Sequence, residues 1–106
     1  PKELLLLALG GCTASDVISI LQKKRVALGG FEIHITADQR DEHPQVFTKI
    51  HLEYVVHGDD IRPEDVERAI ALSESKYCSV SAMLRPALPI TWSYRIEPAR
   101  AARPAA

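Results

Sequence analysis

Two cysteines are the residues of this sequence best suited to chemistry. Cys12 lies in the stretch LALGGCTASD (residues 7–16), where Gly10 and Gly11 precede it within an apolar segment. Each glycine costs a helix interior about 1 kcal/mol relative to alanine, so helix stability does not explain the pair. Cys12 lies about three turns inside its predicted helix, so a cation or a hydrogen-bond donor from another element would have to stabilise its thiolate.

Cys78 lies in a different setting, in the stretch YCSVSAML (residues 77–84). We expect a short helix to start there, and its free N–H groups and positive dipole end would lower the pKa of the Cys78 thiol. A lone cysteine on a helix is nevertheless more often a small packing residue than a reactive one. Composition and spacing therefore leave both readings open for each cysteine.

The remaining polar residues form weaker candidate sites. The four histidines, His34, His43, His51 and His57, have no metal-ligand spacing, although His34 and His51 could share one face of a hairpin. Catalytic zinc needs three convergent protein ligands, so we expect no metal site. No Ser-His-Asp arrangement is readable. The other polar and aromatic candidates are expected to be structural: Thr13 in helix packing, Lys49 and Glu53 on a solvated strand face, Trp92 and Tyr94 in the core or an interface.

Length and charge limit the classes of protein. A chain of 106 residues predicts one domain, and it buries only about 60–65% of its unfolded surface. The 13 basic and 14 acidic residues are mixed along the chain, with a net charge of −1, so we expect no nucleic-acid partner. The apolar start, residues 1–9, is shorter than a membrane span of about 20 residues and lacks a cleavage pattern. We expect a cytoplasmic protein without a membrane partner, in which the thiols are reduced or redox-active.

The hydrophobic periodicity predicts an α+β fold in the order α-β-β-α-α-β. A helix is expected over 2–26, followed by an antiparallel hairpin of two strands, 31–37 and 46–56. Pro63 starts a second helix that should break near Tyr77, with Val66, Ile70 and either Ser73 or Tyr77 on its inner face. A short helix over 79–85 and a final strand over 90–96 follow. The tail, residues 99–106, has no periodicity and is expected to be disordered.

The first helix is apolar on every side in its first half, which is typical of a buried helix. One small sheet covers only one side of such a helix, and monomers rarely expose a large apolar patch. We therefore expect a homodimer.

Two segments together resemble a known family. PKELLLLALGGCTASDVISIL (residues 1–21) and LSESKYCSVSAMLRP (residues 72–86) look like the two signature blocks of the OsmC/Ohr proteins, the osmotically inducible and organic hydroperoxide resistance proteins. The first block carries Cys12, and the second carries Cys78 with Ser81. The resemblance covers residues 1–97 and is nearest to the branch with GGCT. It implies an OsmC-like domain over 1–98, with a long buried central helix, a small antiparallel sheet, two further helices and an intertwined dimer with sites at its interface.

The resemblance also implies a thiol peroxidase that defends against oxidative stress. Cys12 would attack an organic or fatty-acid hydroperoxide as a thiolate, and Cys78 would resolve the sulfenic acid to a disulfide. A dithiol reductant of the lipoyl or thioredoxin type would reset the pair, and no cofactor is expected. The alternative is a non-catalytic protein that binds a small hydrophobic ligand at the dimer interface, with Cys12 as lining.

Two features depart from the family's pattern. Peroxidases of the family hold the thiolate with an arginine from an N-terminal strand, and that arginine is held by a glutamate just after the motif proline. This chain begins at that proline, Pro1, so the usual N-terminal sheet is absent, and we expect that residues upstream are missing. The residue after Pro1 is Lys2, and the acidic residue Glu3 follows one place later, so Lys2 and Glu3 are the expected charge partners of Cys12.

Overall fold

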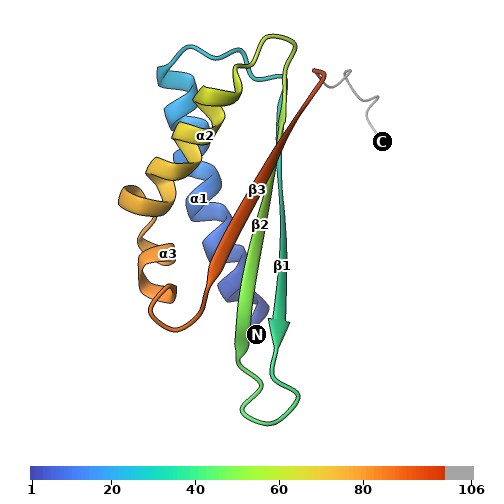
Figure 1. Cartoon of the computed structure of the whole chain (residues 1–106), viewed down its shortest axis with the longest axis vertical. Coiled ribbons are helices and arrows are strands. Elements are labelled where there is room, and N and C mark those ends of the chain that lie inside the picture. Colours follow the sequence, from blue (N-terminus) through green and yellow to red (C-terminus); the bar gives the residue numbers. More distant parts are fainter. Residues whose placement is uncertain (100–106) are drawn as a thin grey trace.

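A computed structural model describes residues 1–99 of the chain. Its elements are α1 (Glu3–Lys23), β1 (Gly30–Gln39), β2 (Phe47–His57), α2 (Pro63–Leu72), the π-helical turn η1 (Ser73–Tyr77), α3 (Ser79–Leu84) and β3 (Ile90–Glu97) (Figure 1). The predicted α+β order is confirmed, with η1 inserted between the second and third helices. The tail is predicted to be disordered, and its residues 100–106 lie outside the described part of the chain.

The three strands form one mixed sheet in the order β1-β2-β3. β1 and β2 are antiparallel, with Ile35 opposite Leu52, as the hairpin prediction required. β3 runs parallel to β2, with Trp92 beside Leu52, so the prediction of an antiparallel sheet is wrong for its third strand. The chain leaves the end of β2 and returns through α2, η1 and α3, and a helical crossover of this kind makes the next strand parallel.

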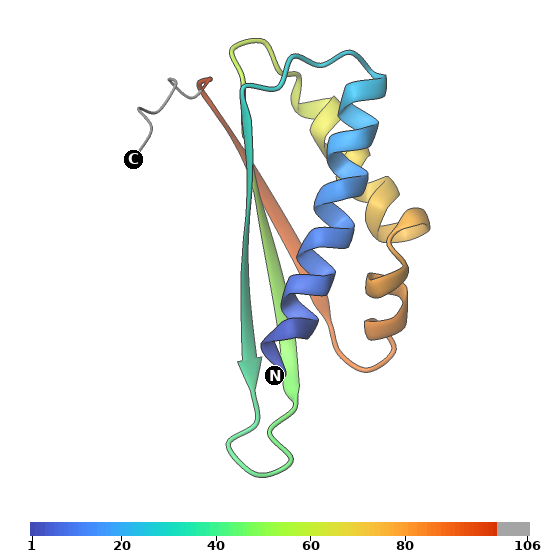
Figure 2. The same ribbon diagram turned by 180° about the vertical axis from the view of Figure 1, so that it is seen from behind.

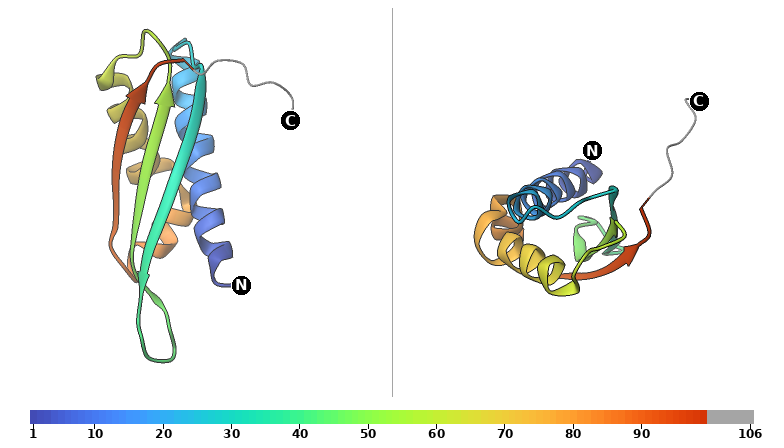
Figure 3. Two further views of the ribbon diagram at one scale, coloured as in Figure 1. Left: turned by 90° about the vertical axis from the view of Figure 1, so that its right-hand side faces the viewer. Right: turned by 90° about the horizontal axis from the view of Figure 1, so that it is seen from above.

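The helices cover one face of the sheet, and the core lies between the two layers (Figures 2 and 3). Alternate side chains of β2 point into this core, because successive residues of a strand face opposite sides. The buried apolar side chains between the layers come mainly from three elements: Leu9, Val17 and Leu21 of α1, Ile50, Leu52, Tyr54 and Val56 of β2, and Val66, Ala69 and Ile70 of α2. α1, the helix that carries Cys12, therefore packs with its Leu9, Val17 and Leu21 side chains in the same core as β2 and α2.

α1 is buried along one side only. Its buried stripe recurs every fourth residue, at Leu9, Thr13, Val17 and Leu21, while Leu4 and Leu7 near its start are 65% and 68% exposed. Within the single chain only one side of α1 is therefore covered, as the sequence predicted for an apolar helix beside one small sheet. This exposed apolar surface is the argument for a homodimer, which stays a prediction.

α1 also has the length and apolar composition of a helix that could cross a membrane. The core helix of a soluble protein meets the same criterion, so this is weak evidence for a membrane span.

The connection from α2 to α3 contains the predicted break. α2 begins with Pro63 at its first turn, and Cys78 is extended, with φ −75° and ψ 103°, just before α3. The sequence left open whether Ser73 or Tyr77 lies on the inner face of the second helix. The inner residue is Ser73, which is fully buried, whereas Tyr77 is 52% exposed. The π-helical turn adds a residue to the helical repeat, and such turns are frequent at functional sites.

Candidate functional site

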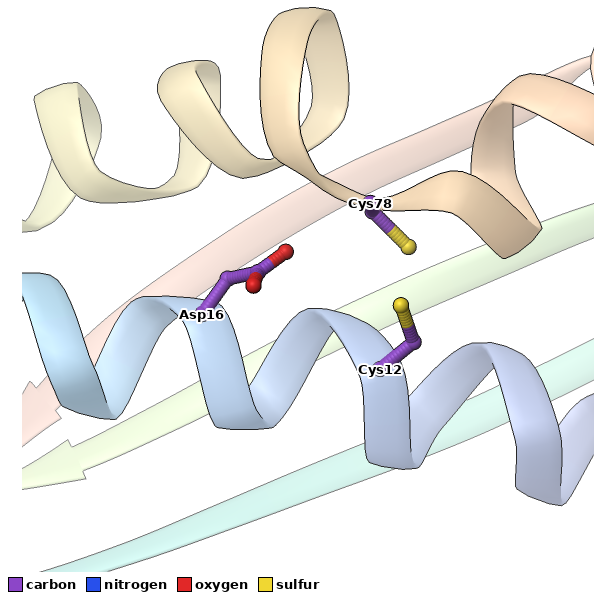
Figure 4. A group of neighbouring side chains, drawn as sticks. All are labelled: Cys12, Asp16 and Cys78. Carbon is purple, nitrogen blue, oxygen red and sulfur yellow. The ribbon is translucent and has the colours of Figure 1, made fainter.

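The structure brings the two cysteines together across the contact between α1 and α3 (Figure 4). The Sγ atoms of Cys12 and Cys78 and a carboxylate oxygen of Asp16 all lie within 4.8 Å of one another. Both cysteines are free thiols; Cys12 is half-buried and Cys78 is buried. Asp16 follows Cys12 by one helical turn, so both side chains leave the same face of α1 toward Cys78. The three groups form the candidate site.

The Cys12 sulfur is stabilised as a thiolate by donors from α3. Burial raises the pKa of the Cys12 thiol, but hydrogen bonds from the Val80 backbone N–H, the Cys78 thiol and Ser79 lower it by more. The net pKa is below the ordinary value for cysteine, although the charge of Asp16 opposes the shift. The sequence predicted that the start of α3 lowers the pKa of Cys78. Its donors instead lower the pKa of Cys12, across the contact between α1 and α3.

The pKa of the Cys78 thiol is shifted in the opposite direction, to a higher value. Burial and, to a smaller extent, the neighbouring Cys12 raise the pKa of its thiol to about 11, against the lowering effect of the Ser81 backbone N–H. That N–H donates to the Cys78 Sγ at 3.3 Å. The prediction that the helix start lowers the pKa of Cys78 is wrong, because burial and the adjacent Cys12 outweigh the donor. Cys12 is thus the first of the pair to ionise, and Cys78 is the thiol that donates to it.

A buried polar network holds α3 next to the cysteines. The Glu74 carboxylate of η1 is only 7% exposed. It accepts hydrogen bonds at 2.9 Å from both the Ser81 hydroxyl and the Arg85 guanidinium. The Thr13 and Tyr54 hydroxyls, which bond to each other, lie 3.3 and 3.4 Å from its other oxygen. Among residues 1–99, no buried side-chain nitrogen or oxygen lacks a partner. The network therefore joins α1, β2, η1 and α3 around one charge-neutralised carboxylate.

Asp16 is connected to this network through Ser73. The Ser73 hydroxyl donates to the Asp16 Oδ2 at 3.0 Å and lies 3.1 Å from the Thr13 Oγ1. Sequence reasoning missed Asp16 and Glu74. The Cys12–Asp16 spacing of four residues could have indicated Asp16, whereas no regular period predicts Glu74, since the π-helical turn shifts the inward face.

Lys2 and Glu3, the expected charge partners of Cys12, lie elsewhere. The Lys2 amine donates to the Gln39 Oε1 at 2.5 Å and to the Gln45 carbonyl at 2.6 Å, at the tip of the hairpin. Glu3 lines a surface cavity beside β1, and nine residues of helix, about 13 Å along its axis, separate it from Cys12. Their role toward the thiolate stays a prediction without a contact to support it, and the groups that stabilise Cys12 come from α3 instead.

The histidines do not join the site. His34 and His51 occupy the face of the hairpin directed away from the helices, as the shared-face prediction stated, with Glu53 opposite His34. His51 contacts two hydroxyls of β3, and His57 pairs with Glu32 at 2.7 Å. Within residues 1–99, the one group of ligand-type side chains close enough to share a metal ion is the cysteine pair with Asp16.

A cleft leads along α1 to the site. It has a volume of about 450 Å³, and its lining includes Asp16, Ile20, Leu72 and Tyr77. Asp16 belongs both to this cleft and to the candidate site, so the cleft meets the site at the Asp16 carboxylate.

Comparisons with known proteins agree with the resemblance in the sequence. The profile of the family described as OsmC-like protein matches residues 1–93. Protein YhfA of Escherichia coli strain K12 is 47% identical over 96 residues, which cover 91% of this chain and 72% of YhfA. A hypothetical protein from Aquifex aeolicus VF5 is 38% identical, with a TM-score of 0.81 over 92% of this chain and 74% of that one. The organic hydroperoxide resistance protein OhrB of Bacillus subtilis is 14% identical and shares the fold alone, with a TM-score of 0.64 over 90% of this chain and 69% of OhrB.

Proposed function

The chain belongs to the OsmC-like protein family, and from this premise we propose that it is a thiol-dependent peroxidase for organic or fatty-acid hydroperoxides. Family membership and the hydroperoxide-resistance neighbours suggest a redox or stress-response role and a soluble protein. The observation that carries the finer proposal is the sulfur pair: Cys78 donates its S–H to Cys12, whose pKa is lowered in spite of burial by the hydrogen bonds that it accepts. A thiolate with a second thiol beside it is the arrangement that a two-cysteine peroxidase needs.

The proposed reaction has two steps on the protein. The Cys12 thiolate attacks one oxygen of the hydroperoxide, the O–O bond breaks, and the leaving alkoxide takes a proton from solvent to become an alcohol. Cys12 is then a sulfenic acid. The Cys78 sulfur displaces its hydroxyl, which leaves as water with the Cys78 proton, and a disulfide forms. A dithiol of the lipoyl or thioredoxin type returns both cysteines to thiols and is itself oxidised to a disulfide.

The surroundings of the pair support this order of events. The two sulfurs are within 4.8 Å, whereas a disulfide needs about 2.05 Å. Cys78 begins α3 in an extended conformation, so a small movement of this residue brings the sulfurs together. The cleft at Asp16 gives the hydroperoxide a route, and its Ile20 and Leu72 side chains suit an organic substituent. We further propose a cytoplasmic homodimer with this site at or near its interface.

Thiol titration tests the proposal. Free thiols are counted in the reduced protein before and after one equivalent of tert-butyl or linoleic hydroperoxide. The wild type should lose both thiols and release one equivalent of alcohol. Cys12→Ser should keep its remaining thiol, and Cys78→Ser should consume one equivalent while Cys12 accumulates as sulfenic or over-oxidised acid, which mass spectrometry detects.

Two results would contradict the proposal. Retention of both thiols by the wild-type protein would exclude the peroxidase. Consumption of peroxide by Cys12→Ser together with an inert Cys78→Ser would make Cys78 the attacking residue and reverse the roles.

One observation favours the alternative of a hydrophobic-ligand protein. An apolar groove of about 350 Å³ lies between the start of α1, the start of β2 and α3, and its lining includes Leu5, Phe47, Leu84 and the cationic Lys2. A non-reactive fatty acid would place its chain there and its carboxylate at Lys2. If both thiols survive hydroperoxide while such a fatty acid raises the melting temperature, the binding function is preferred.

A further inference from the structure

The candidate site brings together three side chains whose sulfur and oxygen atoms are metal ligands in other proteins. With both sulfurs ionised, Cys12, Cys78 and Asp16 would place three negative charges within 4.8 Å of one another. The groups that act most strongly on the two sulfurs are N–H, hydroxyl, thiol and carboxyl groups, with no Lys or Arg among them in the described residues. The nearest guanidinium in the network, that of Arg85, is engaged by Glu74. A divalent cation bound here would displace the Cys78 proton and supply the positive charge that two thiolates and a carboxylate need.

We propose that the reduced protein binds one thiophilic divalent cation, of which Zn²⁺ is the type, through the Cys12 and Cys78 sulfurs and an Asp16 carboxylate oxygen. Thiolates select zinc over magnesium and calcium, and a carboxylate completes a mixed sulfur and oxygen set. Three protein ligands leave the fourth tetrahedral position to water or to an external ligand.

The distances fit such an ion with small adjustments. Zinc lies about 2.3 Å from a thiolate sulfur and about 2.0–2.2 Å from a carboxylate oxygen, so two ligand atoms on a tetrahedral ion are about 3.5–3.8 Å apart. The three ligand atoms are already within 4.8 Å of one another without an ion. Closing by about 1 Å needs a rotation of side chains and no change in the fold.

The outer partners of the three ligands are in place as well. The Ser73 hydroxyl orients the Asp16 carboxylate at 3.0 Å, and the Ser81 N–H donates to the Cys78 Sγ at 3.3 Å. The Val80 N–H does the same for Cys12. Hydrogen bonds of this kind fix ligand orientation in metal sites and contribute strongly to affinity.

The ion would reach the site through the cleft at Asp16, and oxidation of the two cysteines would compete with its binding. The cleft lined by Asp16 opens to solvent, and its Lys23 lies two helical turns away along α1. A Cys12–Cys78 disulfide uses both sulfur ligands, so oxidation of the pair and metal binding exclude each other. In a general dithiol oxidation the two sulfurs lose two electrons to the oxidant, form one S–S bond, and the ion is released.

Metal binding is measured directly, independently of peroxide chemistry. The reduced full chain is titrated with Zn²⁺ against a chromophoric chelator, and with Co²⁺, whose thiolate complexes show charge-transfer absorption. We expect one ion per chain and a cobalt–thiolate spectrum. Cys12→Ser and Cys78→Ser should each lose both signals, and Asp16→Asn should weaken zinc binding by roughly tenfold or more, since even outer partners of zinc ligands contribute about 10- to 100-fold.

Three controls make the result decisive. Asp60→Asn changes an exposed aspartate outside the site and should bind as the wild type does, and protein oxidised with diamide should not bind. Circular dichroism of each variant confirms that it is folded. Zinc binding that persists in either cysteine variant, or a cobalt complex without thiolate bands, overturns the proposal. A failure of the hydroperoxide test leaves this measurement unaffected, so the two proposals are separable.

Discussion

The buried hydroxyl of Tyr54 should stabilise the fold far more than an equivalent exposed hydroxyl. Tyr54 is fully buried, and its hydroxyl shares a 2.5 Å hydrogen bond with Thr13 and donates to Glu74 at 3.4 Å. Tyr54→Phe removes both interactions without a change in ring packing. A buried hydrogen bond contributes about 0.5–1.5 kcal/mol, and one to a charged group about 1.5–3 kcal/mol. Because the bond to Glu74 is long, and Thr13 keeps Ser73 and Glu74 as partners, we expect a loss of about 1–2 kcal/mol.

Tyr94→Phe is the matched control. Its hydroxyl donates to Glu67 at 2.6 Å, a shorter bond than that from Tyr54 to Glu74, but in an exposed position. Water replaces an exposed bond, so the expected change is within about 0.5 kcal/mol.

Both variants are measured by thermal and urea unfolding at one protein concentration, because association would shift apparent stability. For a domain of this size 1 kcal/mol corresponds to about 4–8 °C in Tm, so Tyr54→Phe should lower Tm by roughly 5–15 °C. Equal effects of the two variants, or no loss from Tyr54→Phe, would refute the view that the network around Glu74 is a buried structural unit.

Three further substitutions concern the helix that carries Cys12. Asp16→Asn removes a negative charge that opposes ionisation of Cys12, so the pH midpoint of Cys12 alkylation by iodoacetamide should move to lower pH; an unchanged or higher midpoint would contradict the site geometry. Gly11→Ala should stabilise the chain by about 0.5–1 kcal/mol in urea unfolding, because an added Cβ at Gly11 meets nothing within 4 Å. Gly10→Ala should gain less or lose stability, because its Cβ would overlap the Cδ1 of Ile35; equal gains from both alanines would refute this difference.

The fold was predictable where burial follows a local period. Apolar residues alternate along β2, and buried residues recur every four positions on α1, at Leu9, Thr13, Val17 and Leu21. Both patterns reflect contacts with one neighbouring layer, so the pattern alone locates the elements. The direction of β3 was not predictable in the same way. It depends on how α2, η1 and α3 carry the chain back across the sheet, and the strand's own alternation is the same for either direction.

The sequence was enough to predict which cysteines form the candidate site, but not the pKa shifts of their thiols. The two cysteines are recognisable from the sequence, but the pKa of Cys78 is raised by burial and by Cys12, which no local pattern reports. Glu74 was missed because the π-helical turn changes the helical phase between α2 and Cys78. Its carboxylate then points inward, where Ser81 and Arg85 satisfy it.

The first turn of α3 divides its donors between two sulfurs. The Val80 N–H serves Cys12 and the Ser81 N–H serves Cys78, so the thiolate character of Cys12 is a property of the contact between α1 and α3. The Glu74 network is what holds this contact, since it bonds to Thr13 beside one cysteine and to Ser81 beyond the other. Loosening the network should therefore return Cys12 toward an ordinary thiol even though neither cysteine is altered, and Tyr54→Phe offers this readout. Its Cys12 should alkylate with a pH midpoint closer to that of a free cysteine than the wild-type midpoint, whereas Tyr94→Phe should leave the midpoint unchanged. An unchanged midpoint in a clearly destabilised Tyr54→Phe would mean that α3 keeps its donors in place without the network.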